Sequence, residues 1–179
     1  ICPEKGLHQL VDAFIELAGQ RPKARLRIAG YLAARDQAYR DEQAQRLTAA
    51  GLDDRVDWRG EVDRQGKLDL LHSLDVFTMP TVYHESKGLP VLEALASGVP
   101  VVLPAHGAFP EIIYWTGGGM LVEPNSPTAL AEGILEMADD AEARCGMSAA
   151  GRAAVHEQFS DDAMATATLK EYEKVLCMN

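Results

Sequence analysis

The sequence has little of what marks a disulfide-stabilised or nucleic-acid-binding protein. Its three cysteines are far apart, and their number and spacing suggest neither a disulfide framework nor a zinc site. Twenty-seven acidic residues against seventeen basic ones give a net charge of -10, and no basic cluster is visible, so nucleic acid is not an expected partner. The cysteine content favours a reducing compartment.

Long apolar runs are also missing. No stretch approaches the roughly 20 residues of a transmembrane helix, and the first residues, "ICPEKG", lack the charged and apolar regions of a signal peptide. Taken as it stands, the sequence predicts a soluble, cytoplasmic protein. Its 179 residues, 47% of them hydrophobic, are enough to bury the core of one domain.

Strand and helix patterns alternate along the first two thirds of the chain. Strands are predicted over 24–30, 55–60, 75–80, 99–104 and 118–124, and helices over 6–20, 36–51, 67–74, a segment after Pro90, and 108–114. Repeated strand-helix units with short connections predict an α/β fold, a Rossmann-like parallel sheet sandwiched by helices. Ligands of such sheets bind at the carboxyl ends of the strands.

The two ends of the chain differ from this alternation. After residue 124 only helices are predicted, the first capped by Ser126 with Pro127 behind it and the last capped by Ser160. An α/β unit normally opens with a strand, whereas this chain begins in the turn before a helix. An opening strand is therefore expected upstream of Ile1.

The segment "ESKGLPVLE" carries Glu85 and Glu93 eight positions apart. On one helix they would lie about 12 Å apart along the axis and about 80° apart around it, too far for a carboxylate pair that shares a proton. Pro90 suits the first turn of a helix and disfavours helical geometry at Leu89. Glu85 is therefore expected in a loop and Glu93 inside the following helix.

A helix that begins at this point would present an anion-binding end. Gly88 permits close approach of a ligand to the backbone, and the N–H groups of Gly88, Leu89 and Val91 are expected to point outward, where the helix dipole favours negative charge. Carboxylates beside a bare phosphate would repel it, so Glu85 and Glu93 are better suited to accept hydrogen bonds from hydroxyl groups on either side of the anion. A sugar, a diphosphate and a ribose match this arrangement.

The sequence also resembles a known family, the retaining glycosyltransferases of group 1 or family 4, which have the two-domain GT-B fold. The E-x7-E segment has their form, "PEKGLHQLVDAF" is similar to their phosphate-binding lysine turn and helix, and "LRIAG" to their second strand. The segments "DVFTMPTVYHES", "EALASGVPVVLPAHGAFPEII", "GGGMLVEPNSPTALAEGI" and "GRAAVHEQFSDDAM" continue the similarity in order. The resemblance covers nearly the whole chain.

The resemblance implies roles for particular residues. Glu85 would face the donor sugar and Glu93 would bind the ribose hydroxyls, while Gly88 and Leu89 would give backbone N–H groups to the diphosphate. Lys5 would neutralise phosphate charge as the leaving group departs, from a transition state of oxocarbenium character. No metal or other cofactor is expected.

Three further positions are candidates for the donor site. Lys87 stands where the family often has an aromatic residue, so it is either an added phosphate contact or a solvated side chain. His84 would assist at the sugar, although a loop histidine is more often solvated. Gly107 either lines the donor pocket or serves only as a turn residue.

The sequence departs from the family at its N-terminal end. The arginine that usually pairs with the lysine would fall at or before residue 1 and is absent. We therefore interpret residues 1–179 as the C-terminal, donor-binding domain of a larger enzyme. The N-terminal acceptor domain is missing from this sequence, and the fragment is expected to be inactive alone. Peripheral contact of the full enzyme with a membrane is compatible with this interpretation.

Two alternatives remain open from the sequence. A GT-B nucleotide-sugar epimerase or a sugar-phosphate synthase would share the same half, and a non-catalytic nucleotide-binding α/β module would leave the lysine turn and the glutamates without a ligand. The base, sugar and acceptor are not encoded in any motif, although base recognition by backbone groups is expected near residues 60–62.

Overall fold

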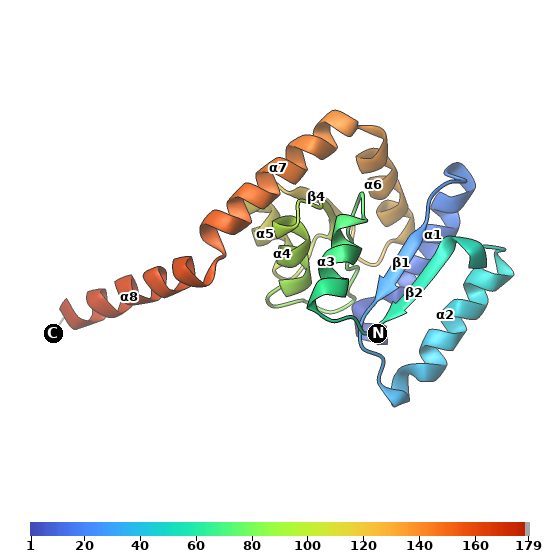
Figure 1. The fold of residues 1–179 in the computed structure, drawn as a ribbon, viewed down its shortest axis with the longest axis horizontal. Coiled ribbons are helices and arrows are strands. Elements are labelled where there is room, and N and C mark those ends of the chain that lie inside the picture. The colour runs from blue at the N-terminus through green and yellow to red at the C-terminus, as the bar shows by residue number, and fades with distance from the viewer. Residues whose placement is uncertain (178–179) are drawn as a thin grey trace.

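A computed structural model describes residues 1–177 (Figure 1). Strands and helices alternate up to residue 122, except that no regular strand separates the helices over 64–72 and 89–96, and helices follow after residue 122 as the sequence predicts. The strands are β1 (Leu26–Ala29), β2 (Val56–Gly60), β3 (Val101–Pro104) and β4 (Gly119–Val122). The helices are α1 (Leu7–Gln20), α2 (Gln37–Ala49), α3 (Arg64–His72), α4 (Leu89–Ala96), α5 (Phe109–Thr116), α6 (Pro127–Asp139), α7 (Ala141–Gln158) and α8 (Asp161–Cys177).

The strands are all paired in parallel, but they form two separate ladders. β1 pairs with β2, and β3 pairs with β4. On the other edge of β3, Phe77 makes a single parallel bridge to Val101. The Phe77 N–H donates to the carbonyl of Pro100, and the Phe77 carbonyl accepts from Val102, both at 3.0 Å.

The prediction of a strand over 75–80 is therefore wrong in its extent. Only Phe77 pairs, and the rest of the segment adjoins no strand on its other edge among the described residues. A strand is stabilised by hydrogen bonds to its neighbouring strands, so a segment that has only β3 beside it does not form a regular strand over its whole length. The predicted strands near β1, β2, β3 and β4 are confirmed.

Helices cover both faces of the strands. α1 contacts α2 and α6, while α7 contacts α4 and α5 (Figure 1). The core is divided accordingly, because successive residues of a strand point to opposite faces. Val102 of β3 packs with α1 and α6, whereas Val101 and Leu103 pack with α4 and α5. The predicted helical sandwich of an α/β protein is confirmed.

Helix caps follow the sequence closely. Ser126 Oγ accepts from the N–H of Ala129 at 3.2 Å, and Ser160 Oγ accepts from the N–H of Ala163 at 3.1 Å, so both predicted caps are present. The third helix begins three residues before the predicted Lys67, because Asp63 caps it through the N–H of Gly66.

The last helix, α8, buries none of its described side chains and extends away from the rest of the molecule (Figure 1). Among the described residues its main contact is a small one with α7, and its Leu169, Tyr172 and Leu176 are exposed. Among residues 1–177, no helix is both long and apolar enough to cross a membrane.

Candidate functional site

The predicted lysine turn is fixed against the loop that precedes Glu85. Gly6 has φ +73°, and a side chain there would place Cβ only 1.7 Å from the carbonyl oxygen of Pro80. The N–H of Val82 donates to the carbonyl of Glu4 at 3.0 Å. Only glycine permits this approach, which brings the two ends of the site together.

This contact joins the side chains of Lys5, Tyr83 and Glu85. Lys5 Nζ lies 2.8 Å from Glu85 Oε2 and 2.5 Å from the Tyr83 hydroxyl, and that hydroxyl lies 2.5 Å from the same carboxylate oxygen. The other oxygen, Oε1, accepts from the N–H of Ser86 at 3.1 Å. The Glu85 side chain is only 12% exposed, so its carboxylate is enclosed by donors.

The enclosure keeps Glu85 ionised. Hydrogen bonds from Lys5 and then from Tyr83 lower the pKa of Glu85 to about 2, against the opposing effect of burial. The pKa of Lys5 is raised, because its hydrogen bonds to Glu85 and Tyr83 outweigh its desolvation. The pKa of Tyr83 is also raised, first by burial and then by its hydrogen bond to Glu85. At neutral pH the pair is an ammonium beside a carboxylate.

The backbone of Glu85 packs closely against Gly107. With φ +59°, a side chain at Gly107 would place Cβ 2.6 Å from the carbonyl oxygen of Glu85, and that carbonyl accepts from the N–H of Ala108 at 2.8 Å. Of the two sequence interpretations of Gly107, the turn residue fits these contacts better. It shapes the Glu85 loop by close packing.

The helix that carries Glu93 begins at Leu89, one residue before the start predicted at Pro90. Gly88, at φ +63°, is the N-cap of α4, and Pro90 lies in the first turn, so Glu85 is in the loop and Glu93 in the helix. The expectation for Val91 is wrong, because its N–H closes the first turn onto the Gly88 carbonyl at 2.8 Å. The N–H groups of Gly88 and Leu89 have no backbone partner among the described residues and remain available to an anion.

Glu93 has a cationic partner of its own. Its Oε1 accepts from Lys67 Nζ of α3 at 2.7 Å. Both side chains are about half exposed, 45% for Glu93 and 42% for Lys67. This ion pair is open to solvent, so a ligand hydroxyl can reach Glu93 without displacing packed protein.

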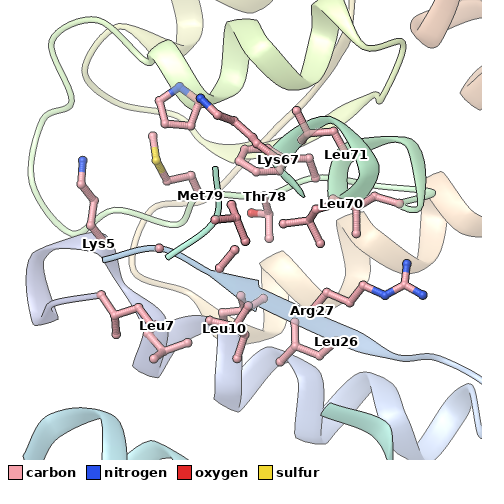
Figure 2. A pocket seen from close by; sticks show the side chains of 18 of the residues that line it. Lys5, Leu7, Leu10, Leu26, Arg27, Lys67, Leu70, Leu71, Thr78 and Met79 are labelled. Atoms are coloured by element: carbon pink, nitrogen blue, oxygen red, sulfur yellow. The ribbon is translucent and has the colours of Figure 1, made fainter. Parts of the chain in front are cut away.

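A cavity of about 510 Å³ adjoins these residues. Its lining includes Lys5, Tyr31, Lys67 and Glu93, and Tyr31 lies just past the carboxyl end of β1. Its interior is apolar and runs between β1 and the segment around Phe77 (Figure 2). The structure thus brings Lys5 and Glu93 to one cavity near the carboxyl end of β1, and ligands of parallel sheets bind at the carboxyl ends of the strands.

The remaining candidates lie at the rim. His84 is exposed and stacks on His106, with ring centroids 5.3 Å apart. Lys87 is exposed, and its side chain makes no hydrogen bond or ion pair with the described residues. Both face solvent beside Glu85 rather than the cavity.

Two residues of the site were not found from the sequence. Tyr83 stands two residues before Glu85, and its position in the same loop was the available signal. Lys67 is 26 residues before Glu93 on another helix, and no spacing rule connects them. Lys67 meets Glu93 only when α3 packs beside α4, and Tyr83 meets Lys5 only when its loop packs against the turn before α1.

The fold and the position of this site define an α/β Rossmann-like domain of the kind found as the C-terminal domain of GT-B proteins. The family model described as "Glycosyl transferases group 1" matches residues 1–154. The chain therefore belongs to the glycosyl transferases group 1 family.

Curated relatives agree with this membership. The GDP-mannose-dependent monoacylated alpha-(1-6)-phosphatidylinositol monomannoside mannosyltransferase of Corynebacterium glutamicum is 32% identical over 170 residues, which are 92% of this chain and 42% of the relative. The lipopolysaccharide core biosynthesis mannosyltransferase LpsB of Rhizobium meliloti is 32% identical over 177 residues, or 97% of this chain and 49% of the relative. The chain spans less than half the length of these relatives.

Solved structures share the fold. A C-terminal domain of the group 1 protein LpcC from Francisella tularensis has a TM-score of 0.82 and 28% identity, over 90% of this chain and 83% of that one. HepE from Anabaena, in complex with UDP and glucose, has a TM-score of 0.88 over 97% of this chain and 46% of that one, and its 23% identity shows the fold alone.

Proposed function

We propose that this chain is the donor-binding domain of a retaining glycosyltransferase and that it binds a nucleotide-diphospho-sugar. The observation that carries the proposal is the shared opening of Lys5 and Glu93 at the free end of α4, with Glu85 held ionised against Lys5. Family membership supports it, and so does the name of the Corynebacterium relative, which is described as GDP-mannose-dependent. HepE, a structural neighbour, was solved with UDP and glucose.

In this proposal the diphosphate lies over the N–H groups of Gly88 and Leu89 at the start of α4. Lys5 turns from Glu85 toward the diphosphate, because a phosphate group carries more negative charge than one carboxylate. Lys87 is free to add a second cation from the rim. The positive helix end and these cations supply the charge, so the proposed chemistry uses no metal ion.

The two glutamates accept hydrogen bonds from hydroxyl groups on either side of the diphosphate. Glu93 accepts hydrogen bonds from the ribose hydroxyls, and Glu85 faces the sugar. When Lys5 moves to the diphosphate, one carboxylate oxygen of Glu85 becomes free to accept a hydrogen bond, while the Tyr83 hydroxyl keeps the carboxylate oriented. His84 borders the sugar from the same loop, and Gly107 fixes the loop backbone.

The transfer belongs to the longer protein. The bond between the anomeric carbon and the phosphate oxygen breaks, a bond from that carbon to an acceptor oxygen forms with the same configuration, and the acceptor proton leaves with the nucleoside diphosphate. The acceptor would be held by an N-terminal domain preceding this chain, and residues 1–179 alone would bind donor without transferring it. We place the enzyme in the cytoplasm, with peripheral membrane contact where the acceptor is a lipid.

Calorimetry with GDP, UDP and ADP tests the proposal. We expect at least one of them to bind this chain at millimolar concentration or below, with EDTA leaving the affinity unchanged. Replacing Glu93 by Ala is expected to weaken that binding about tenfold or more, the value of hydrogen bonds to a charged group.

Glu132→Ala is the matched control, because Glu132 is an exposed helical glutamate of α6 outside the cavity. It should leave the affinity as it is. If none of the three nucleotides binds either this chain or the longer protein, the proposed function is wrong.

A further inference from the structure

The loop that leads to Glu85 is held by the turn that follows β3. The ring nitrogen Nε2 of His106 lies 2.8 Å from the carbonyl oxygen of Thr81, where the loop begins. The same ring stacks on that of His84, with centroids 5.3 Å apart and planes 14° apart. The N–H of Ala108 donates to the carbonyl of Glu85, where the loop ends. Two of these three contacts come from one side chain, that of His106.

The bond between His106 and Thr81 satisfies a buried carbonyl. Thr81 is only 1% exposed, and a carbonyl shielded from water has to accept a hydrogen bond from the protein. Among residues 1–177 no backbone N–H donates to it, and His106 is its partner. A carbonyl can only accept, so Nε2 of His106 carries the hydrogen. The other ring nitrogen, Nδ1, is buried without a partner among the same residues, so the ring makes this single hydrogen bond.

Thr81 lies between the two contacts that bring the lysine turn to this loop. The preceding residue, Pro80, packs on Gly6, and Tyr83, two residues after Thr81, hydrogen-bonds Lys5 at 2.5 Å. The position of the Thr81 carbonyl therefore sets the path of the chain between the lysine turn and the Glu85 carboxylate. Without the His106 N–H, the carbonyl has to turn toward water to find another donor, and the loop shifts with it.

The ring of His106 also connects the core to the rim of the site. Its centroid lies 5.9 Å from that of Phe109, which is fully buried. His84, on which the ring stacks, is exposed and directly precedes Glu85. His106 therefore transmits the fixed position of the core to the loop at two points, the Thr81 carbonyl and the His84 ring.

We propose that His106 is a positioning residue of the donor-sugar site, because its Nε2–H fixes the loop that presents Glu85 to the sugar. The reference to the sugar rests on the proposed function. His106 acts through the backbone of residues 81–85 and through the cluster of Lys5, Tyr83 and Glu85, and it does not itself contact the ligand. Loss of its hydrogen bond therefore disturbs the Glu85 carboxylate before any ligand binds.

A matched pair of amide variants isolates the Nε2 donor. The amide nitrogen of His106→Gln reaches the position of Nε2, whereas that of His106→Asn ends near the position of Nδ1, and both variants lack the ring. We expect the pKa of Glu85 to rise from about 2 toward 4.5 in His106→Asn and to stay closer to about 2 in His106→Gln. Carbon NMR of the glutamate carboxyl groups, recorded without nucleotide, measures both titrations.

His106→Phe is the converse change, because it keeps an aromatic ring and removes the donor. It should raise the pKa of Glu85 as His106→Asn does. His156→Phe is the control, since Nε2 of His156 also lies against a backbone carbonyl, that of Ala96 at 3.2 Å, but on α7. It should leave the titration of Glu85 unaltered.

The proposal is overturned if His106→Asn and His106→Phe, shown to be folded by urea unfolding, titrate Glu85 as the parent does. It is also overturned if His106→Gln shifts the titration as far as His106→Asn, or if His156→Phe shifts it equally. A role in stability alone would lower the free energy of unfolding without separating Gln from Asn at Glu85.

Calorimetry then tests the link to the sugar. The probes are GDP with GDP-mannose and UDP with UDP-glucose, and the pair that binds the parent chain is used. We expect His106→Asn to change the affinity for the nucleoside diphosphate by less than about twofold and to weaken the nucleotide-sugar about fivefold or more, because only the sugar faces Glu85. Equal weakening of both members overturns the assignment to the sugar. If no nucleotide binds either this chain or the longer protein, the proposed function is wrong, and the titration of Glu85 still decides whether His106 positions it.

Discussion

The surroundings of Glu85 and Glu93 differ, although both carboxylates bind one lysine at nearly the same distance. Glu85 is 12% exposed and receives hydrogen bonds from Lys5, Tyr83 and two backbone N–H groups, whereas Glu93 is 45% exposed and its carboxylate binds only Lys67 among residues 1–177. Packed loops fix the orientation of the Glu85 carboxylate before any ligand binds, whereas the Glu93 carboxylate is exposed and can exchange its partner. A ligand would therefore rearrange the Glu85 cluster but simply add to the Glu93 pair.

The largest effect is expected from Gly6→Ala, which disrupts the close packing that brings Lys5 to Tyr83 and Glu85. The added methyl would meet the Pro80 carbonyl at 1.7 Å in a left-handed conformation, so we expect a loss of about 2–5 kcal/mol in the free energy of unfolding. Urea unfolding measures it. Gly19→Ala is the control, because its methyl meets open space and helix propensity should stabilise α1 by up to about 1 kcal/mol. Equal stability of both variants would contradict the role of Gly6.

Lys5→Met removes the main donor of the Glu85 cluster. We expect the pKa of Glu85 to rise from about 2 toward 4.5, because the Lys5 hydrogen bond is the largest cause of its low value. The ionised Glu85 carboxylate stabilises the fold above pH 4.5, and this stabilisation is lost as the pH falls from 4.5 toward 2. The free energy of unfolding of the variant should therefore differ from that of the parent mainly above pH 4.5. Carbon NMR of the glutamate carboxyl groups follows the titration.

Lys174→Met serves as the control for this change, since Lys174 also binds a glutamate, Glu171, but at an exposed site on α8. It should leave the titration of Glu85 unaltered. An unshifted Glu85 in Lys5→Met would mean that the loop, and not the ammonium, sets its ionisation.

Tyr83→Phe separates the hydroxyl from the ammonium. The expected rise in the pKa of Glu85 has the same sign but is smaller than for Lys5→Met, because Tyr83 is the second cause of the shift. The same NMR titration measures it, with Tyr172→Phe on exposed α8 as the control. A rise equal to that of Lys5→Met would show that Tyr83 positions Lys5 and does not act by itself.

The smallest effect is expected at Glu93. Lys67→Met breaks an ion pair whose members are both more than 40% exposed, and such pairs contribute about 0–1 kcal/mol. Urea unfolding should therefore give a value within about 0.5 kcal/mol of the parent. A loss comparable to that of Gly6→Ala would abolish the contrast between the two glutamates.

Much of the local structure was predictable from the sequence. Pro90 and Gly88 placed Glu85 in a loop and Glu93 in a helix, and Ser126 and Ser160 marked the starts of their helices. The segment 75–80 was predicted as a strand because its own residues favour one. Its ladder depends on neighbours, and these are absent on one side among the described residues.

The sequence by itself determined most of the order of elements, the capped starts of the helices after Ser126 and Ser160, and the separation of the two glutamates, because these follow from propensity, capping and periodicity within a few residues. Only the tertiary structure decided which lysine each glutamate binds. Lys5 and Glu85 are 80 residues apart and meet where the lysine turn packs against the Glu85 loop, whereas Lys67 and Glu93 are 26 residues apart and meet between α3 and α4. The cavity between the two ladders is likewise a property of strand pairing, which no local pattern contains.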